Sequence, residues 1–169
     1  IVETPTEGAA DAALDIAAAI ERCVEERGRC VIGFGAGKGV LEVYDELVRL
    51  YFADKVSFAK VVAFNISELG FGQQATESQN NFRRLQERLF NKIDIDPSNV
   101  YTIDEGATKE NVHRYCKQYE TLIDSFGGID LLVCQLTKNG GLAFNEPGSQ
   151  STSSCRLVLL SNDTRQRIA

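Results

Sequence analysis

Residues 30–39 read CVIGFGAGKG, a short apolar run that breaks into a turn rich in glycine. The first five of these residues have the length and composition of a buried strand. Residues 40–52 follow with the apolar spacing of an amphipathic helix. A strand, a glycine-rich turn and a helix in this order are typical of one unit of an α/β fold.

The alternation of strands and helices continues on both sides of this unit. Residues 4–7 form a capping box, which predicts a helix over residues 9–27 that ends at Gly28. Further strands are predicted at 60–65, 100–103 and 129–134, and further helices at 77–92 and 109–126. Parallel strands need crossover helices and bury both of their faces. The sequence therefore predicts a three-layer α/β fold, a mostly parallel, Rossmann-like sheet with helices on both faces.

The composition limits the number of domains and the kinds of partner. The chain has 169 residues, of which 43% are hydrophobic, and this is enough for one buried core. We therefore expect a single domain over residues 1–169. The apolar runs are shorter than the roughly 20 residues of a membrane span, so no membrane segment is predicted. The net charge of −6, with no basic cluster, argues against nucleic acid or an anionic membrane as a partner.

The five cysteines include no CxxC pair, and His113 is the only histidine in the sequence. This pattern predicts no metal site. Cys30 and Cys134 lie in apolar, strand-like runs, which favours buried reduced thiols and leaves a nucleophilic or redox role as the alternative. Reduced thiols are typical of a cytoplasmic protein, and we expect that location.

Ligands of open α/β sheets bind at the carboxyl ends of the strands, so the loops at 35–39, 66–76 and 135–148 are the candidate site. The first loop matches neither GxGxxG nor the Walker pattern. Its glycines and the start of the following helix still favour an anion such as a phosphate monoester. A tight turn without a ligand is the alternative. The phosphate-binding residues we expect are Gly35, Ala36, Gly37, Lys38 and Gly39.

Two other charged groups have a structural interpretation. Asp94 and Asp96 belong to a turn and are expected to cap it. The third predicted helix carries a basic cluster that we interpret as a solvated face or a subunit contact. Its members are Arg83, Arg84, Glu87 and Arg88.

The third loop carries the more specific signal, because residues 140–147 read GGLAFNEP. This run resembles the signature loop of glucosamine-6-phosphate deaminases, also called isomerases, usually written Gly-x-Asp-Gly-His-Ile-Ala-Phe-Asn-Glu-Pro. A related lactonase family shares the fold but lacks the Phe-Asn-Glu-Pro tetrapeptide. Other segments agree with the deaminase family in order and approximate spacing: VSF at 56–58, VVAFN at 61–65, ES at 77–78, IDI at 93–95 and NDTR at 162–165. The resemblance spans residues 33–165.

The resemblance implies a sugar-phosphate isomerase-like domain that is incomplete at its C-terminus, because the family's domain is longer. It also implies a small-molecule sugar phosphate as the ligand, no cofactor, and assembly into homo-oligomers. In the family, an aspartate after the second strand moves the proton between C1 and C2, and a histidine with acidic partners opens the ring. These positions fall at Ser67, Asn139 and Gly141 in this chain, and Glu146 keeps its identity.

These replacements bear on the chemistry, because a serine hydroxyl is too weak a base without its own activator. Glu68 is adjacent to Ser67, but neighbouring extended residues point to opposite faces, so Glu68 would need a local bulge to take its place. The resemblance therefore implies a divergent, catalytically silent relative in carbohydrate metabolism. The alternative is an active aldose–ketose isomerase or deaminase that acts on glucosamine 6-phosphate or an analogue through Glu68 or Glu146.

Overall fold

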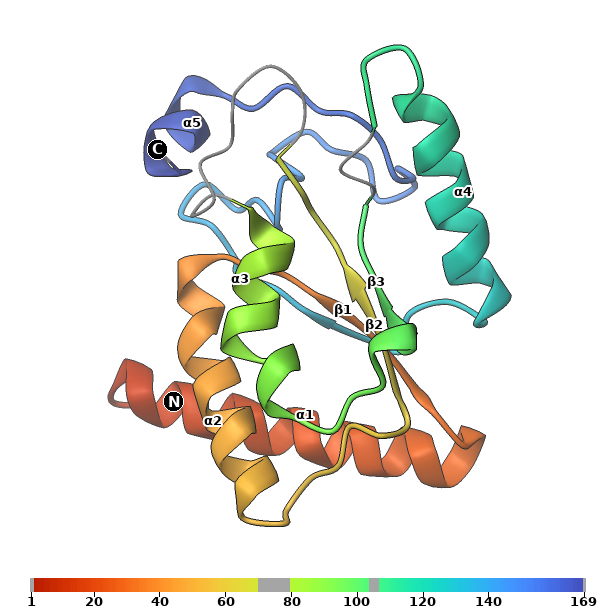
Figure 1. The fold of residues 1–169 in the computed structure, drawn as a ribbon. Helices are drawn as coiled ribbons and strands as arrows, with labels where there is room; N and C mark the ends of the chain where they lie inside the picture. The colour runs from red at the N-terminus through yellow and green to blue at the C-terminus, as the bar shows by residue number, and fades with distance from the viewer. Residues whose placement is uncertain (1, 70–79, 104–106, 169) are drawn as a thin grey trace.

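The computed structural model describes residues 2–69, 80–103 and 107–168, and its centre is a parallel sheet of four strands (Figure 1). The strand order is β3-β2-β1-β4, with β1 paired to both β2 and β4. The predicted three-layer α/β fold is confirmed. The strands are β1 (Cys30–Phe34), β2 (Val61–Asn65), β3 (Val100–Tyr101) and β4 (Leu131–Val133).

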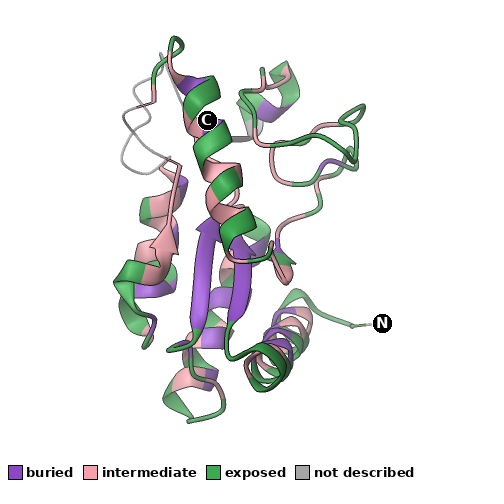
Figure 2. Cartoon of the chain, turned by 90° about the vertical axis from the view of Figure 1, so that its right-hand side faces the viewer, coloured by how far each residue is buried: buried purple, intermediate pink, exposed green. Residues whose placement is uncertain are grey.

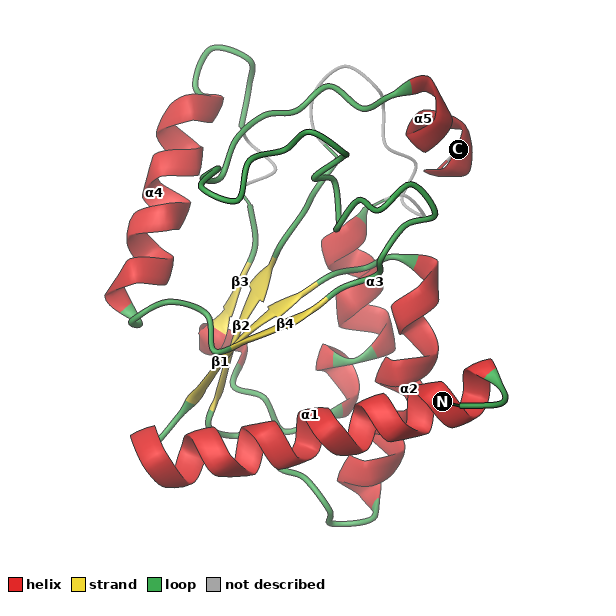
Figure 3. Ribbon diagram, turned by 180° about the vertical axis from the view of Figure 1, so that it is seen from behind, coloured by secondary structure: helices red, strands yellow, loops and turns green. Residues whose placement is uncertain are grey.

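Helices cover both faces of the sheet, as Figures 1 and 3 show. One face packs against α1 (Pro5–Arg27), α2 (Leu41–Phe52) and α3 (Asn81–Arg88), and the other against α4 (Val112–Ser125). Both faces of β1 and β2 are buried, which is why these strands are continuous apolar runs (Figure 2). A further helix, α5 (Asn162–Ile168), follows the last loop and was not predicted.

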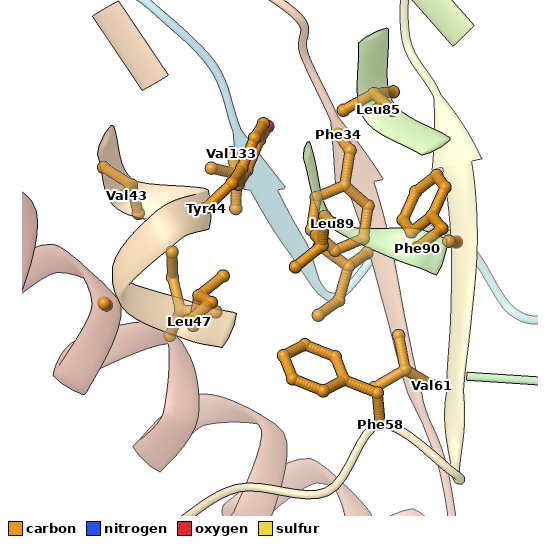
Figure 4. Packing of buried hydrophobic residues seen from close by; sticks show 14 of the residues in the cluster. Phe34, Val43, Tyr44, Leu47, Phe58, Val61, Leu85, Leu89, Phe90 and Val133 are labelled. Atoms are coloured by element: carbon orange, nitrogen blue, oxygen red, sulfur yellow. The ribbon is translucent and has the colours of Figure 1, made fainter. Parts of the chain in front are cut away.

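The larger core lies between the sheet and the layer of α1, α2 and α3. Alternate residues of β1 point into it, because successive side chains of a strand face opposite sides. Figure 4 shows Phe34 beside Leu89 and Phe90, with Tyr44 of α2 close by. Phe34 makes edge-to-face ring contacts with Tyr44 and Phe90, at centroid distances of 5.9 and 5.4 Å. This packing fixes the position at which β1 ends and the glycine loop begins.

The ends of several elements differ from the prediction. The capping box is present, but α1 begins at Pro5 rather than at residue 9, because proline suits the first helical position. Strand β3 stops at Tyr101, two residues short of the prediction, and β4 is also shorter than predicted. Helix α3 begins at Asn81, where the side chain of Asn80 accepts a hydrogen bond from the Arg83 amide. The predicted start at 77–79 lies outside the described residues.

The sheet topology decides where a ligand would bind. After β1 the chain adds β2 and β3 on one side, and it then returns to place β4 on the other side of β1. The loops that leave β1 and β4 therefore diverge at a topological switch point, where open α/β sheets bind their ligands. None of the described helices combines the length and the apolar character needed to cross a membrane.

Two segments that resemble the family, at 56–58 and 93–95, are joined by hydrogen bonds on the side of the molecule opposite the topological switch point. The carboxylate of Asp94 accepts hydrogen bonds from the Ser57 hydroxyl and the Phe58 amide, both at 2.6 Å. Asp96 caps the 3₁₀ turn at Pro97–Asn99 by accepting from the Ser98 amide at 2.8 Å. The structural interpretation of both acids is confirmed.

Candidate functional site

A cavity of about 310 Å³ lies at the carboxyl ends of β1, β2 and β4. Residues from all three candidate loops line it, together with two side chains of α3. Its size is at the lower end of the range for small-molecule sites. The lining residues used below are Gly35, Ala36, Gly37, Lys38, Ser67, Asn81, Arg84 and Thr137.

Contacts with β4 and α2 hold the glycine loop in place. The Gly35 amide donates to the Val133 carbonyl at 2.8 Å, and the Tyr44 hydroxyl donates to the Gly35 carbonyl. The Gly39 amide donates to Oε1 of Gln135 at 3.1 Å. Residues 35–38 line the cavity, whereas Gly39 turns away into the 3₁₀ turn at Lys38–Val40. The Lys38 side chain is exposed and supplies a positive charge at the rim.

The structure adds a second cation, Arg84, to this cavity. Its Nη1 donates to the Ala36 carbonyl at 2.9 Å, and the residue is half-buried. The prediction that the basic cluster is a solvated face is therefore wrong for Arg84. It holds for Arg83 and Arg88, which form exposed ion pairs with Glu87 and Asp45.

The sequence contains a signal that Arg84 faces the cavity. Asn81 and Arg84 are three residues apart, so they share one face of α3, and that face points at the glycine loop. The charge pattern along the helix favours a solvated face or a subunit contact instead. The fold decides which face of α3 meets the cavity, because it brings α3 beside the loop after β1.

Ser67 lies in the cavity, where the resemblance places the proton-moving residue of the family. Its carbonyl accepts from Nδ2 of Asn81 at 3.0 Å, and its amide donates to Oδ1 of Asn65 at 3.4 Å. Ser67 is therefore held beside the glycine loop. Among the described residues with a carboxylate, none lines this cavity.

Glu68 holds the start of α3 and does not line the cavity. Its Oε1 accepts from the amides of Leu69 and Asn81, and its Oε2 accepts from the amide of Phe82 and the side chain of Asn65, at 2.9–3.1 Å. A carboxylate beside the N-terminus of a helix also interacts favourably with the helix dipole. Both oxygens are therefore occupied by structural hydrogen bonds.

The loop that carries the family resemblance is closed mostly on itself. Oδ1 of Asn139 accepts from the Thr137 hydroxyl at 2.6 Å and from the Gly141 amide at 3.3 Å. A Cβ atom on Gly141 would lie 2.9 Å from the Thr137 hydroxyl and 3.0 Å from the Asn145 carbonyl, so the loop in this form has no room for a histidine. Neither Asn139 nor Gly141 lines the cavity.

Glu146 also lies away from the cavity lining. Its Oε1 accepts from the amide and the hydroxyl of Ser161, at 3.1 and 2.9 Å. The carboxylate thus connects the loop after β4 to the residues just before α5. In this arrangement it positions a chain segment, and it is not among the residues that line the two cavities with Ser67.

A larger space of about 900 Å³ lies between α4 and residues 153–160, and both Ser67 and Glu68 line it. The Tyr119 hydroxyl donates to the Asn65 carbonyl at 2.8 Å, and burial raises the pKa of Tyr119. Arg156 donates to Asn145 and Ser149, at 2.9 and 3.2 Å. Among the described residues, the group of side chains that could hold a metal ion lies elsewhere, beside the first residue of β1.

Comparison with known proteins identifies the family of this chain. The family model for glucosamine-6-phosphate isomerases and 6-phosphogluconolactonase matches residues 3–160. A glucosamine-6-phosphate deaminase-like protein of Bacteroides thetaiotaomicron is 39% identical over 98% of this chain and 25% of its own length. Glucosamine-6-phosphate deaminase 1 of Giardia intestinalis is 34% identical over 92% of this chain and 57% of its own length.

Solved structures show the same likeness. A monomeric glucosamine-6-phosphate deaminase superposes with a TM-score of 0.86 at 28% identity, over 98% of this chain and 66% of that one. A 6-phosphogluconolactonase from Plasmodium vivax shares the fold, with a TM-score of 0.74 at 19% identity over 86% of this chain and 50% of that one. This chain thus spans between a quarter and about two thirds of the proteins named here. By its sequence and its fold, the chain belongs to the family of glucosamine-6-phosphate isomerases and 6-phosphogluconolactonases.

Proposed function

We propose that the chain binds a sugar phosphate in the 310 Å³ cavity, with the phosphate group at residues 35–38. The observation that carries this proposal is the cavity lining, which joins the glycine loop to Lys38, Arg84 and Ser67. Two cations beside backbone amides suit a phosphate group, because charge-assisted hydrogen bonds to phosphate are strong and a basic rim attracts anions. The relatives named for glucosamine 6-phosphate make an amino-sugar phosphate the first ligand to test.

We further propose that this chain does not carry out the deaminase reaction by the family's route. Proton transfer between carbon atoms needs a base with a suitable pKa within hydrogen-bond reach of the substrate. Ser67, the residue that the resemblance aligns with the family's aspartate, lines the cavity, and the neighbouring Glu68 accepts hydrogen bonds from the start of α3. Glu68 does line the larger cavity beside Ser67, but its carboxylate oxygens accept hydrogen bonds from three backbone amides, which weighs against catalysis through Glu68 and supports a binding role. The hydrogen bonds from Ser161 weigh in the same direction for Glu146.

Calorimetry with glucosamine 6-phosphate and with unphosphorylated glucosamine tests the binding role. We expect saturable binding of the phosphorylated sugar only. Arg84→Ala should weaken it about tenfold or more, since an interaction with a charged partner is worth roughly 1.5–3 kcal/mol. Arg83→Ala is the matched control, because Arg83 is on the same helix but is exposed and paired with Glu87. Equal binding of the two sugars would contradict the proposal.

A coupled assay of ammonia release and fructose 6-phosphate formation tests the second part. We expect no turnover above background from the unmodified chain. Turnover that disappears in Glu68→Gln or Glu146→Gln would establish the alternative instead. Ser67→Asp is the informative gain-of-function variant, because it restores a carboxylate beside the glycine loop.

We also propose that the protein is cytoplasmic and forms homo-oligomers. The free thiols support the first expectation and the family resemblance supports the second, while one similar structure is of a monomeric deaminase. Light scattering on the purified chain measures the oligomeric state, and a monomeric mass at every concentration would contradict the second expectation.

A further inference from the structure

Three side chains with metal-binding atoms meet at the end of β1 opposite the cavities. Cys23 comes from α1, Cys30 is the first residue of β1, and Asp130 immediately precedes β4. One donor atom of each lies within 4.8 Å of the other two. Figure 3 shows the end of α1 leading into β1 at this end of the sheet, away from the loops that follow the strands.

The three residues are enclosed and one of them is held firmly in place. Cys30 is fully buried, Cys23 is half-buried, and the Asp130 side chain is 10% exposed. Oδ2 of Asp130 accepts from the Val31 amide at 2.8 Å, and Oδ1 forms an ion pair with Arg27. A carboxylate positioned by such partners is typical of metal sites, where surrounding groups orient the ligands.

We propose that Cys23, Cys30 and Asp130 bind one soft divalent cation of the zinc class, with a water molecule as fourth ligand. Zinc and cadmium favour thiolate sulfur, and zinc accepts carboxylate oxygen in a four-coordinate site. The sequence predicted no metal site because the two cysteines are seven positions apart and form no CxxC pair. The pairing of β1 with β4 supplies the third ligand, which spacing along the chain cannot reveal.

The charges balance both without and with the ion. Burial raises the pKa of the Cys30 thiol to about 12, with Cys23 contributing, so Cys30 is protonated when no metal is bound. With Cys30 protonated, the Arg27–Asp130 ion pair adds no net charge to the site. Binding breaks two S–H bonds, forms two S–metal bonds and releases two protons to solvent. The divalent ion, two thiolates, Asp130 and Arg27 again sum to zero, which limits the cost of burying charge.

The metal would link α1 to the sheet and would leave the sugar-phosphate cavity unchanged. The site therefore stands independently of the proposed function. Two consequences can be measured: metal raises the melting temperature, because it binds only the folded arrangement of the three ligands, and it does not alter the affinity for glucosamine 6-phosphate.

The test is titration of the reduced, untagged, metal-free chain with Cd²⁺ and with Zn²⁺. We expect one ion per chain, an ultraviolet sulfur-to-cadmium charge-transfer band, and release of about two protons per Zn²⁺ at neutral pH. Cys23→Ser should abolish the band. Asp130→Asn should weaken Zn²⁺ binding about tenfold to a hundredfold, in a competition assay with a coloured chelator.

Cys116→Ser is the matched control, because Cys116 is also a buried thiol near a second cysteine, Cys155. It should bind Zn²⁺ like the unmodified chain. A band that survives in Cys23→Ser but is lost in Cys116→Ser would overturn the proposal. If the cysteine variants do not fold, the unmodified chain decides the question, since absence of saturable binding or of proton release would also overturn the proposal.

Discussion

The two sides of the 310 Å³ cavity are held by different kinds of contact. On the α3 side, Glu68 links the end of β2 to the amides of Asn81 and Phe82, residues 13 and 14 positions away. On the other side, the loop at 137–145 is closed by bonds within itself, such as those between Thr137 and Gly141. The loop that reveals the family is thus held mainly by its own hydrogen bonds, whereas the α3 side is tied to the end of β2, and both sides line the cavity.

Burial follows the same division. Leu85 and Leu89 of the α3 side are fully buried, whereas Leu136 and Leu142 of the loop side are 67% and 46% exposed. A change on the α3 side is therefore transmitted to the core, and a change in the loop stays local. Substitutions on the two sides should differ in the same way, and the predictions below test that difference.

Glu68→Ala should have the largest effect, a loss of about 3 kcal/mol in the free energy of unfolding. The substitution removes the acceptor from three backbone amides, and each lost hydrogen bond costs about 1 kcal/mol. Urea unfolding followed by circular dichroism measures this loss. Glu87→Ala on the exposed face of α3 is the control and should change stability by roughly 0.5 kcal/mol or less. Similar losses in the two variants would remove the structural role assigned to Glu68.

Gly33→Ala should cost about 2 kcal/mol by overpacking the end of β1. The added Cβ would lie 2.7 Å from Cγ2 of Ile66 and 2.8 Å from Cδ1 of Leu132. Gly33 faces the side of the sheet opposite α3, so this pair compares a position in the sheet with one in the loop: at Gly140 the φ of +83° disfavours alanine but no atom lies within 4 Å. The expected cost of Gly140→Ala is about 1 kcal/mol. Thermal and urea unfolding measure the loss of stability in both variants. A larger loss in Gly140→Ala than in Gly33→Ala would contradict this prediction.

The strands and helices of the fold were predictable because their signals are local. The alternation of strands and helices and the apolar run at β1 predicted the three-layer fold, and the capping box predicted the first helix. The family signature came from a contiguous loop. In each of these cases the information lies within a few neighbouring residues.

The parts of the site that the sequence did not reveal depend on contacts between distant segments. Whether Arg84 faces solvent or the cavity depends on α3 lying beside the loop after β1. The position of Glu68 next to Ser67 allows a role as a base, but its partners are the amides at the start of α3. Asp130 reaches Cys23 and Cys30 only because β4 pairs with β1. Spacing along the chain contains none of these contacts.

Alkaline pH should lower the stability of the folded chain through Tyr44 of α2, whose hydroxyl donates to the Gly35 carbonyl in the glycine loop. Burial raises the pKa of Tyr44 above its ordinary value of 10.0, so the folded chain keeps a proton that the unfolded chain releases. This stability is complete below pH 10 and declines above it, by about 1.4 kcal/mol per pH unit for one group.

Urea unfolding between pH 8 and 11 measures this decline, and Tyr44→Phe should reduce its slope. Cys30 contributes in the same direction, since its pKa rises from 9.0 to about 12. Cys30→Ala separates the two contributions, because it should flatten the curve from about pH 9 while Tyr44→Phe should flatten it from about pH 10. A slope unchanged in both variants would show that neither group controls alkaline stability.

Asn139→Ala should have the smallest effect, a loss of about 1 kcal/mol or less, because Asn139 is exposed and its partners Thr137 and Gly141 lie in its own loop. Asn139 stands where the family has a loop aspartate, so the same variant separates two views of the loop. If the loop is a closed unit beside the cavity, calorimetry with glucosamine 6-phosphate gives the same affinity with and without the substitution. A tenfold loss of affinity without further loss of stability would place Asn139 against the ligand, and the two sides of the cavity would then contribute to binding alike.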